Sequence, residues 1–166
     1  TNVCIKKIDF DGLTNGSKPN GNLIQATNGK LYGLTPSGGS NGDGVLFQYD
    51  INSNVFIKKH DFLISTNGEY PMGGLCQATD GKLYGMTNSG GTNGLGTLFQ
   101  YDPVSNSLIK KNDFSGVLDG SLPNTSLMQA SDGFLYGTTS EGGSNNFGTL
   151  FQYDINTSTI NKKIDF

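Results

Sequence analysis

The single histidine and the repeated aspartates are the first candidates in this sequence for acid–base chemistry. Such catalysis needs titratable groups held together in a cleft. The single histidine, His60, stands at a position where the chain carries Ile8, Asn112 and Ile164 at intervals of 52 residues. A lone histidine at one copy of a variable position is typical of a surface residue. We therefore expect no catalytic role for it.

Aspartates, in contrast, recur in every copy of the pattern. One set closes a predicted strand at Asp50, Asp102 and Asp154, and a second set closes the next strand at Asp9, Asp61, Asp113 and Asp165. Residues present in every copy serve what all copies share, which is the fold. Aspartate at a strand end commonly accepts a hydrogen bond from the backbone two residues on. The pattern predicts structural caps.

Motifs for metal, phosphate or nucleophilic chemistry are absent from the sequence. Cys4 and Cys76 occupy positions that are apolar in the other copies, which favours small buried hydrophobic side chains. Asp50, Asn52 and Asn54 alternate as a calcium loop begins, but no glycine or distal glutamate follows them. We predict no metal, no cofactor and no enzymatic activity.

Loop residues that differ between copies are the candidates for ligand binding. Binding side chains concentrate on loops held by a rigid scaffold. An aromatic ring beside amide and carboxylate groups suits a sugar ring, so a glycan or a surface protein is the expected ligand. The alternative is that these are unconstrained loop positions. The candidates are Lys18, Asp43, Tyr70, Asn88, Glu141 and Phe147.

A repeat of 52 residues without insertion or deletion positions all of these side chains. The copies span residues 11–62, 63–114 and 115–166, and residues 1–10 repeat the tail of a copy as an orphan outer strand. A repeat of this length indicates one supersecondary unit stacked on copies of itself, each burying its core against its neighbours.

Each copy predicts four antiparallel strands, here called a to d in chain order. In the second copy, residues 75–79 and 82–87 flank Asp80-Gly81, which favours a type I′ hairpin turn. A glycine-rich loop leads to strands at 97–102 and 107–114, and a proline-containing loop leads to the next copy. Lys-Lys pairs on strand d suit an outer edge, where lysine blocks pairing with other sheets.

The segment from Ser115 to Asp154 resembles the tandem repeat called GloVer, which is found in bacterial surface and secreted proteins. The matching residues are DGSLP at 119–123 and the run from Leu127 to Phe151, and the other copies differ little. One copy also looks like a kelch blade, although Phe56, Leu108 and Ile160 stand where kelch blades carry tryptophan. The resemblance implies a β-propeller, a secreted or cell-surface setting and no defined catalytic residues.

The expected fold is therefore all-β, with three four-stranded blades of a β-propeller. Propellers close with four or more blades, so we expect other chains or a longer parent to complete the ring. Self-association as a dimer, trimer or filament would achieve this. A β-trefoil, which closes alone with the same strand count, is the alternative.

The predicted function is a non-enzymatic extracellular module that binds a glycan or protein through its loop face. The alternative is a structural subunit that assembles into a ring or filament through its blade edges. Net charge is −3 and all eleven basic residues are lysine. Because arginine is the usual reader of phosphates and bases, we expect no nucleic-acid partner. No apolar run reaches the roughly 18 residues of a membrane helix, so we expect no membrane insertion.

Overall fold

The computed structural model describes residues 3–166, and the predicted tail falls partly outside it at residues 1 and 2. The described chain is all-β and contains no helix, so no helix in it is long and apolar enough to cross a membrane. The twelve strands are β1 Ile24–Gln25, β2 Leu31–Thr35, β3 Val45–Asp50, β4 Val55–Asp61, β5 Cys76–Gln77, β6 Leu83–Thr87, β7 Thr97–Asp102, β8 Ser107–Asp113, β9 Met128–Gln129, β10 Leu135–Thr139, β11 Thr149–Asp154 and β12 Thr159–Asp165.

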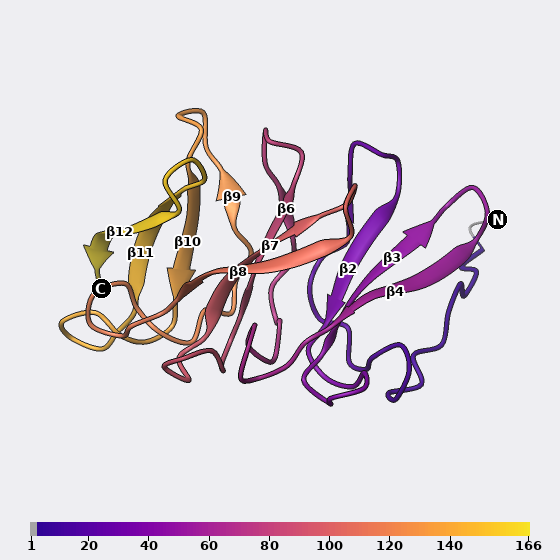
Figure 1. Cartoon of the computed structure of the whole chain (residues 1–166), viewed down its shortest axis with the longest axis horizontal. Helices are drawn as coiled ribbons and strands as arrows, with labels where there is room; N and C mark the ends of the chain where they lie inside the picture. Colours follow the sequence, from indigo (N-terminus) through magenta and orange to yellow (C-terminus); the bar gives the residue numbers. More distant parts are fainter. Residues whose placement is uncertain (1–2) are drawn as a thin grey trace.

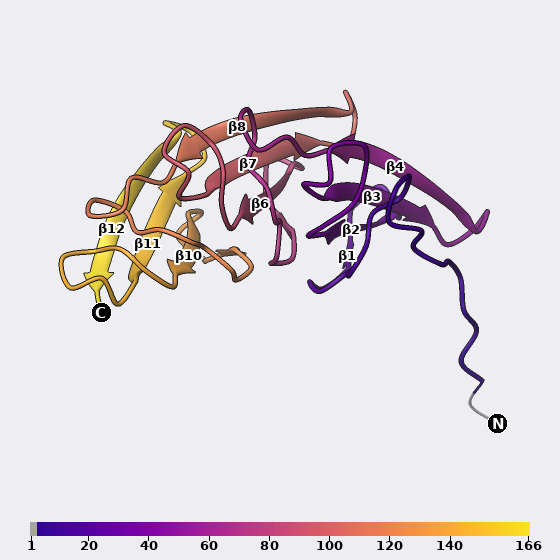
Figure 2. The same ribbon diagram turned by 90° about the horizontal axis from the view of Figure 1, so that it is seen from below.

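The strands form three separate four-stranded antiparallel sheets, each in chain order and each within one sequence copy. We call them blades 1, 2 and 3. They stand side by side (Figure 1) and follow an arc with the long fourth strands on its convex side (Figure 2). This confirms the predicted blade architecture. The β-trefoil alternative is wrong, because each copy pairs its strands only within its own sheet.

The first strand of each blade is short and its turn differs from the prediction. In blade 1, Gly29 N donates to Ala26 O (2.8 Å) and Ala26 N donates to Lys30 O (2.9 Å). Only Gly29 in this turn has a positive φ, 78°. A type I′ turn needs two such residues, so the turn is a type I turn followed by a glycine bulge.

The outer strands carry a β-bulge at the second lysine of each pair. In blade 2, Leu98 faces Asn112 but the next residue, Phe99, faces Lys110, so Lys111 is the extra residue. The same shift occurs on β4 and β12. A bulge and an edge lysine both oppose pairing with another sheet. The prediction that lysines protect an outer strand fits this geometry.

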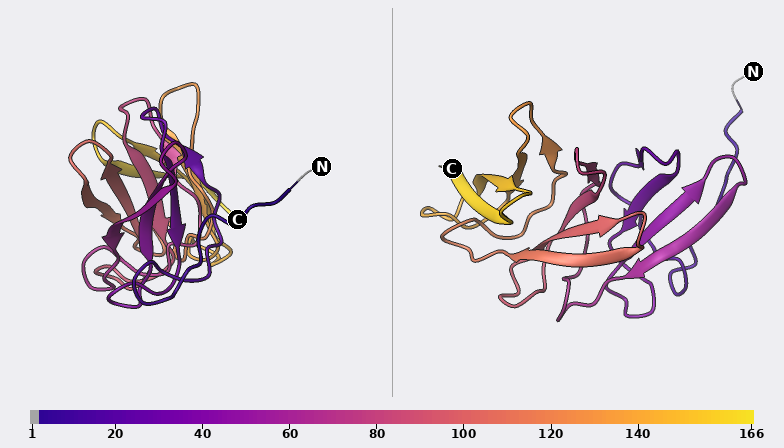
Figure 3. Two further views of the ribbon diagram at one scale, coloured as in Figure 1. Left: turned by 90° about the vertical axis from the view of Figure 1, so that its right-hand side faces the viewer. Right: turned by 45° about the horizontal axis from the view of Figure 1, so that its top comes forward.

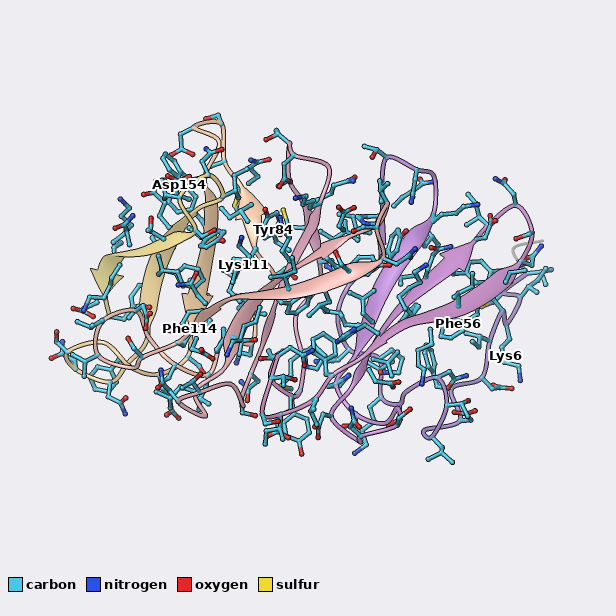
Figure 4. The ribbon with its side chains drawn as sticks, viewed as in Figure 1. Lys6, Phe56, Tyr84, Lys111, Phe114 and Asp154 are labelled. Atoms are coloured by element: carbon cyan, nitrogen blue, oxygen red, sulfur yellow. The ribbon has the colours of Figure 1, made fainter. Side chains whose placement is uncertain are left out.

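The apolar core lies between blades. Between blades 1 and 2, Tyr32, Leu34 and Leu46 of blade 1 pack with side chains of blade 2, and the corresponding residues repeat this between blades 2 and 3. Tyr84 and Phe114 mark that second interface (Figure 4). The backbones approach closely where a Cβ on Gly73 would lie 2.1 Å from the carbonyl oxygen of Thr125. Each blade therefore depends on a neighbour for much of its buried surface.

Residues 3–10 form no strand, although their sequence copies the outer strand. Within the described residues, this segment pairs with none of the three sheets. The segment stands away from the blades until it reaches blade 1 (Figure 3).

Candidate functional site

Three of the predicted ligand-binding residues meet at the junction of blades 1 and 2. Tyr70 N donates to Asp43 O (3.1 Å), and Asn88 N donates to Tyr70 O (3.0 Å). The Tyr70 side chain is 43 % exposed. This cluster places an aromatic ring, a carboxylate and an amide on the loop face.

The polar side chains of this cluster also have structural partners. Asp43 Oδ2 accepts a hydrogen bond from Ile64 N (2.8 Å), and Asn88 Nδ2 lies 3.5 Å from Pro123 O. Tyr70 adopts φ 53°, as do its counterparts Lys18 (57°) and Leu122 (53°). Since the backbone at this position makes the link between blades, the side chain is free to vary.

The other three candidates lie elsewhere. Lys18 is on blade 1, and Glu141 and Phe147 are on blade 3, so the six residues do not form one site. Leu122 N of blade 3 donates to Leu95 O of blade 2 (3.0 Å), which repeats the Tyr70–Asp43 bond. The equivalent donor in blade 1 is Lys18 N, and the equivalent acceptor in blade 3 is Phe147 O. These two atoms lie at opposite ends of the arc. The positions that vary between copies therefore lie at blade junctions as well as on free loops.

The outward face of blade 1 is a large apolar surface. It holds a hollow of about 300 Å³, and the lining side chains on the blade include Leu23, Leu31, Phe47, Tyr49 and Phe56. Figure 4 shows Phe56 at this end of the molecule. Leu23 is 56 % exposed, whereas its counterparts Leu75 and Leu127 are 7 % and 4 % exposed. The face has the composition of a blade junction without the neighbouring blade.

The outward face of blade 3 is the complementary half. Tyr136 and Leu150 are half-buried there, while their counterparts in blades 1 and 2 are fully buried. Met128 and Phe166 are 61 % and 53 % exposed. Together the two end faces carry the two sides of the interface that occurs twice inside the chain.

The repeated aspartates act as caps of two kinds. Asp50, Asp102 and Asp154 each accept a backbone hydrogen bond from the residue two positions on, as predicted. The second set differs, because its partner is distant. Asp61 accepts hydrogen bonds from Ser40 N (2.9 Å) and Ser40 Oγ (3.0 Å). Its Oδ2 lies 2.7 Å from Lys58 Nζ.

This geometry lowers the pKa of three members of the second set, Asp61, Asp113 and Asp165. At Asp165, the hydrogen bond from Lys162, together with those from Ser144, holds the pKa below its usual value. At Asp61 burial acts in the opposite direction, yet the bonds from Lys58 and Ser40 outweigh it and the pKa is lowered. These carboxylates are ionised clamps between the outer strand and the glycine-rich loop.

His60 is half-buried, which differs from the surface position expected for it. Its Nε2 lies 2.7 Å from Asn67 Nδ2, and its ring packs against Phe62 at 5.8 Å. Burial lowers its pKa, with Asp61 opposing the shift. Within residues 3–166, no three His, Cys, Asp or Glu side chains gather closely enough to hold a metal ion.

Sequence reasoning missed the side chains of the end faces, because they are identical in type to buried ones. A signal was present in the repeated glutamines. Gln77 Oε1 accepts from Thr27 N of blade 1 (2.9 Å), and Gln129 Oε1 accepts from Thr79 N of blade 2 (2.9 Å). Gln25 has the same side chain on the open face of blade 1.

Comparison with solved structures supports the propeller-like arrangement. TolB from Acinetobacter baumannii matches with 14 % identity and a TM-score of 0.51 over 80 % of this chain and 29 % of that one. The extracellular domain of a hybrid two component system from B. thetaiotaomicron matches with 18 % identity and a TM-score of 0.57 over 86 % of this chain and 16 % of that one.

A fungal alcohol oxidase, solved in complex with copper, matches with 15 % identity and a TM-score of 0.51 over 83 % of this chain and 28 % of that one. The chain thus corresponds to less than a third of each of these proteins, and at these identities the likeness concerns the fold alone. No curated protein matches the sequence.

A family model matches nearly the whole chain. The match runs over residues 3–166, which include all three blades and the segment before them, and the model describes the Gloeobacter/Verrucomicrobia repeat. The chain belongs to the Gloeobacter/Verrucomicrobia repeat family.

Proposed function

We propose that this chain is a non-enzymatic structural module whose end blades associate with further copies of the repeat to complete a propeller. The observation that carries the proposal is the open face of blade 1. Leu23, Leu31 and Tyr49 are exposed or half-buried there, while their counterparts in blades 2 and 3 are buried. Exposed apolar patches are typical of interaction sites, and protein–protein interfaces are among them.

The energetics favour reversible association. Burying a Leu or Phe side chain contributes about 1.5–3 kcal/mol, and the end-face side chains are already partly covered. Their total gain is of the same order as the roughly 4–15 kcal/mol that association costs in lost freedom. We therefore expect assembly that depends on concentration.

The proposed setting is secreted or on a bacterial cell surface. One structural neighbour is an extracellular domain, which supports this setting. Eleven lysines without arginine favour a partner other than nucleic acid. The resemblance of each blade to a kelch blade stays a prediction.

Solution mass tests the assembly. Sedimentation velocity over a concentration series should show the 17.6 kDa chain moving to a larger species. Leu23→Glu places a charge on the open face at a position exposed in the single chain, and should prevent the shift. Val104→Glu, at a turn residue that is 91 % exposed, is the matched control and should not. A wild-type chain that stays at 17.6 kDa at every concentration would contradict the proposal.

A second candidate function is recognition of a glycan or protein on the loop face. It is favoured by the meeting of Asp43, Tyr70 and Asn88 at one blade junction. A glycan array should detect binding that Tyr70→Ala removes. Phe147→Ala, on a different blade, should leave that binding intact. Binding that survives Tyr70→Ala would place the site elsewhere.

A further inference from the structure

A phenylalanine directly follows each outer strand, and after β4 and β8 it packs against the next blade. Phe62 meets Phe99 of blade 2 with ring centroids 5.1 Å apart at 65°, and Phe114 meets Phe151 of blade 3 at 5.4 Å and 65°. We call the place taken by Phe62 or Phe114 the Phe socket of the following blade. Both residues are fully buried.

The Phe socket of blade 1 is already filled from within the chain. Phe10 meets Phe47 at 5.5 Å and 62°, which reproduces the geometry of the other two sockets. Phe166 is the fourth member of the series and is 53 % exposed. Within the described residues there are thus three sockets and four phenylalanines that fit them.

The two candidates for the blade 1 socket differ in how firmly they are held. Residues 3–10 form no strand, and their Lys6–Asp9 ion pair has side chains 72 % and 77 % exposed. In β12, the equivalent Lys162–Asp165 pair is 24 % and 27 % exposed, and Asp165 also binds Ser144. Strand β12 is paired with β11 from Asp154 to Thr149. Displacing residues 3–10 therefore costs much less than displacing β12.

We propose that Phe166 of a second copy replaces Phe10 in the blade 1 socket, so that residues 3–10 are a removable plug over a head-to-tail interface. This inference rests on the proposed function. The occupant is a second copy, because the outward face of its blade 3 is equivalent to two faces that are covered inside the chain. These are the face of blade 1 that packs on blade 2 and the face of blade 2 that packs on blade 3. The plug makes assembly a competition between Phe10 and Phe166.

Polar groups on the two end faces complement one another. Gln25 on blade 1 stands where Gln77 and Gln129 accept a backbone hydrogen bond from the preceding blade. Ser131 on blade 3 has the position of Thr27 and Thr79, whose backbone N donates to the glutamine Oε1 and whose hydroxyl accepts from the glutamine Nε2. A second copy would complete this hydrogen bond. It would also complete the backbone hydrogen bond from Lys18 N of one copy to Phe147 O of the other.

One residue makes this junction weaker than the two internal ones. A Cβ on Gly21 or Gly73 would lie 2.4 Å or 2.1 Å from a backbone oxygen of the next blade. The equivalent residue in the third copy is Thr125, which has a side chain. The Thr125 hydroxyl instead lies 3.2 Å from that of Thr138. The second copy must sit slightly farther away at this point, which suits reversible contact.

A closed pair of copies is the assembly that this junction favours. Twice three blades makes six, within the roughly four to eight of closed propellers. The two end blades bend toward the same side of the arc (Figure 2), as closure requires. Each copy then contributes one socket and one Phe166.

Two alanine variants of the full chain test the exchange because their expected effects have opposite sign. Phe166→Ala should raise the dissociation constant measured by sedimentation about tenfold or more. A tenfold change corresponds to about 1.4 kcal/mol of association free energy. Phe10→Ala removes the competitor and should strengthen association several-fold. Thr125→Gly should also strengthen it. Thermal melts of the dilute chain should be similar for Phe166→Ala and wild type, which shows that the fold is kept.

The results separate the plug from assembly in general. If Phe10→Ala weakens association and Phe166→Ala has no effect, the plug is wrong while assembly stands. If wild type, Phe10→Ala and Thr125→Gly all remain at 17.6 kDa, both proposals fail.

Discussion

Blade 1 and blade 2 carry the same apolar residue types on the same faces, yet one face is open and the other is core. Leu75 of blade 2 is 7 % exposed and its counterpart Leu23 of blade 1 is 56 % exposed. Tyr101 is fully buried, while Tyr49 is half-buried. The difference teaches that a blade face is neither core nor interface by itself, and that the neighbouring blade decides which it becomes.

The largest expected contrast is between the buried and the terminal phenylalanine. Phe62→Ala should lower the free energy of unfolding by about 3–5 kcal/mol, because it empties a filled socket. Phe10→Ala should lower it much less, since Phe10 is only half-buried and comes from a segment without strand pairing. Urea unfolding of dilute chain measures both. Equal losses would show that residues 3–10 are an integral part of blade 1.

A smaller contrast is expected for the paired leucines. Leu75→Ala should cost about 2–5 kcal/mol of unfolding free energy, as other core leucines do. Leu23→Ala should change the stability of the single chain by about 0.5 kcal/mol or less, as exposed substitutions do. At high concentration, where copies associate, the effect of Leu23→Ala should grow. A constant effect across concentrations would argue that its face stays open.

The smallest expected effect is on the stability contributed by the aspartates that link the outer strand to the glycine-rich loop, and on how this stability changes in acid. Their folded-state pKa values lie below the ordinary value of 3.8. The stability that they contribute is therefore present above pH 3.8 and is lost as pH falls through the lowered pKa. Asp113→Asn should reduce the unfolding free energy at pH 7 by about 1 kcal/mol or less, as a mostly solvent-screened pair does.

Thermal melts from pH 7 to acid check this. The difference between Asp113→Asn and wild type should shrink as the pH falls. Asp9→Asn is the matched control, because its ion pair with Lys6 is highly exposed, and it should have little effect. A difference that grows in acid would have the wrong sign.

Much of each blade was accessible from sequence because its determinants are local. Alternating side chains predicted three of the four strands with bounds close to those observed. The caps at Asp50, Asp102 and Asp154 also followed, since their partners lie two residues away. The turn type was wrong, because Asp80-Gly81 fits either a type I′ turn or a glycine bulge and the strand register chooses between them.

Contacts between distant residues were beyond local reasoning. Asp61 was expected to bind its own backbone, yet it clamps Ser40, 21 residues earlier. The bulge at Lys111 changes which residues face one another on the outer strand. Of the proposed site, the candidates Asp43, Tyr70 and Asn88 came together, while Lys18 and Phe147 lie at opposite ends of the arc.

By itself the sequence determined the strands, the order of hairpins and the number of blades, because these depend on side-chain alternation and hydrogen bonds between near neighbours. Only the tertiary structure decided which apolar faces are covered and that Phe10 fills the socket of blade 1. The physical reason is that burial is a property of pairs of surfaces. Two identical leucines, such as Leu23 and Leu75, differ only in what stands against them.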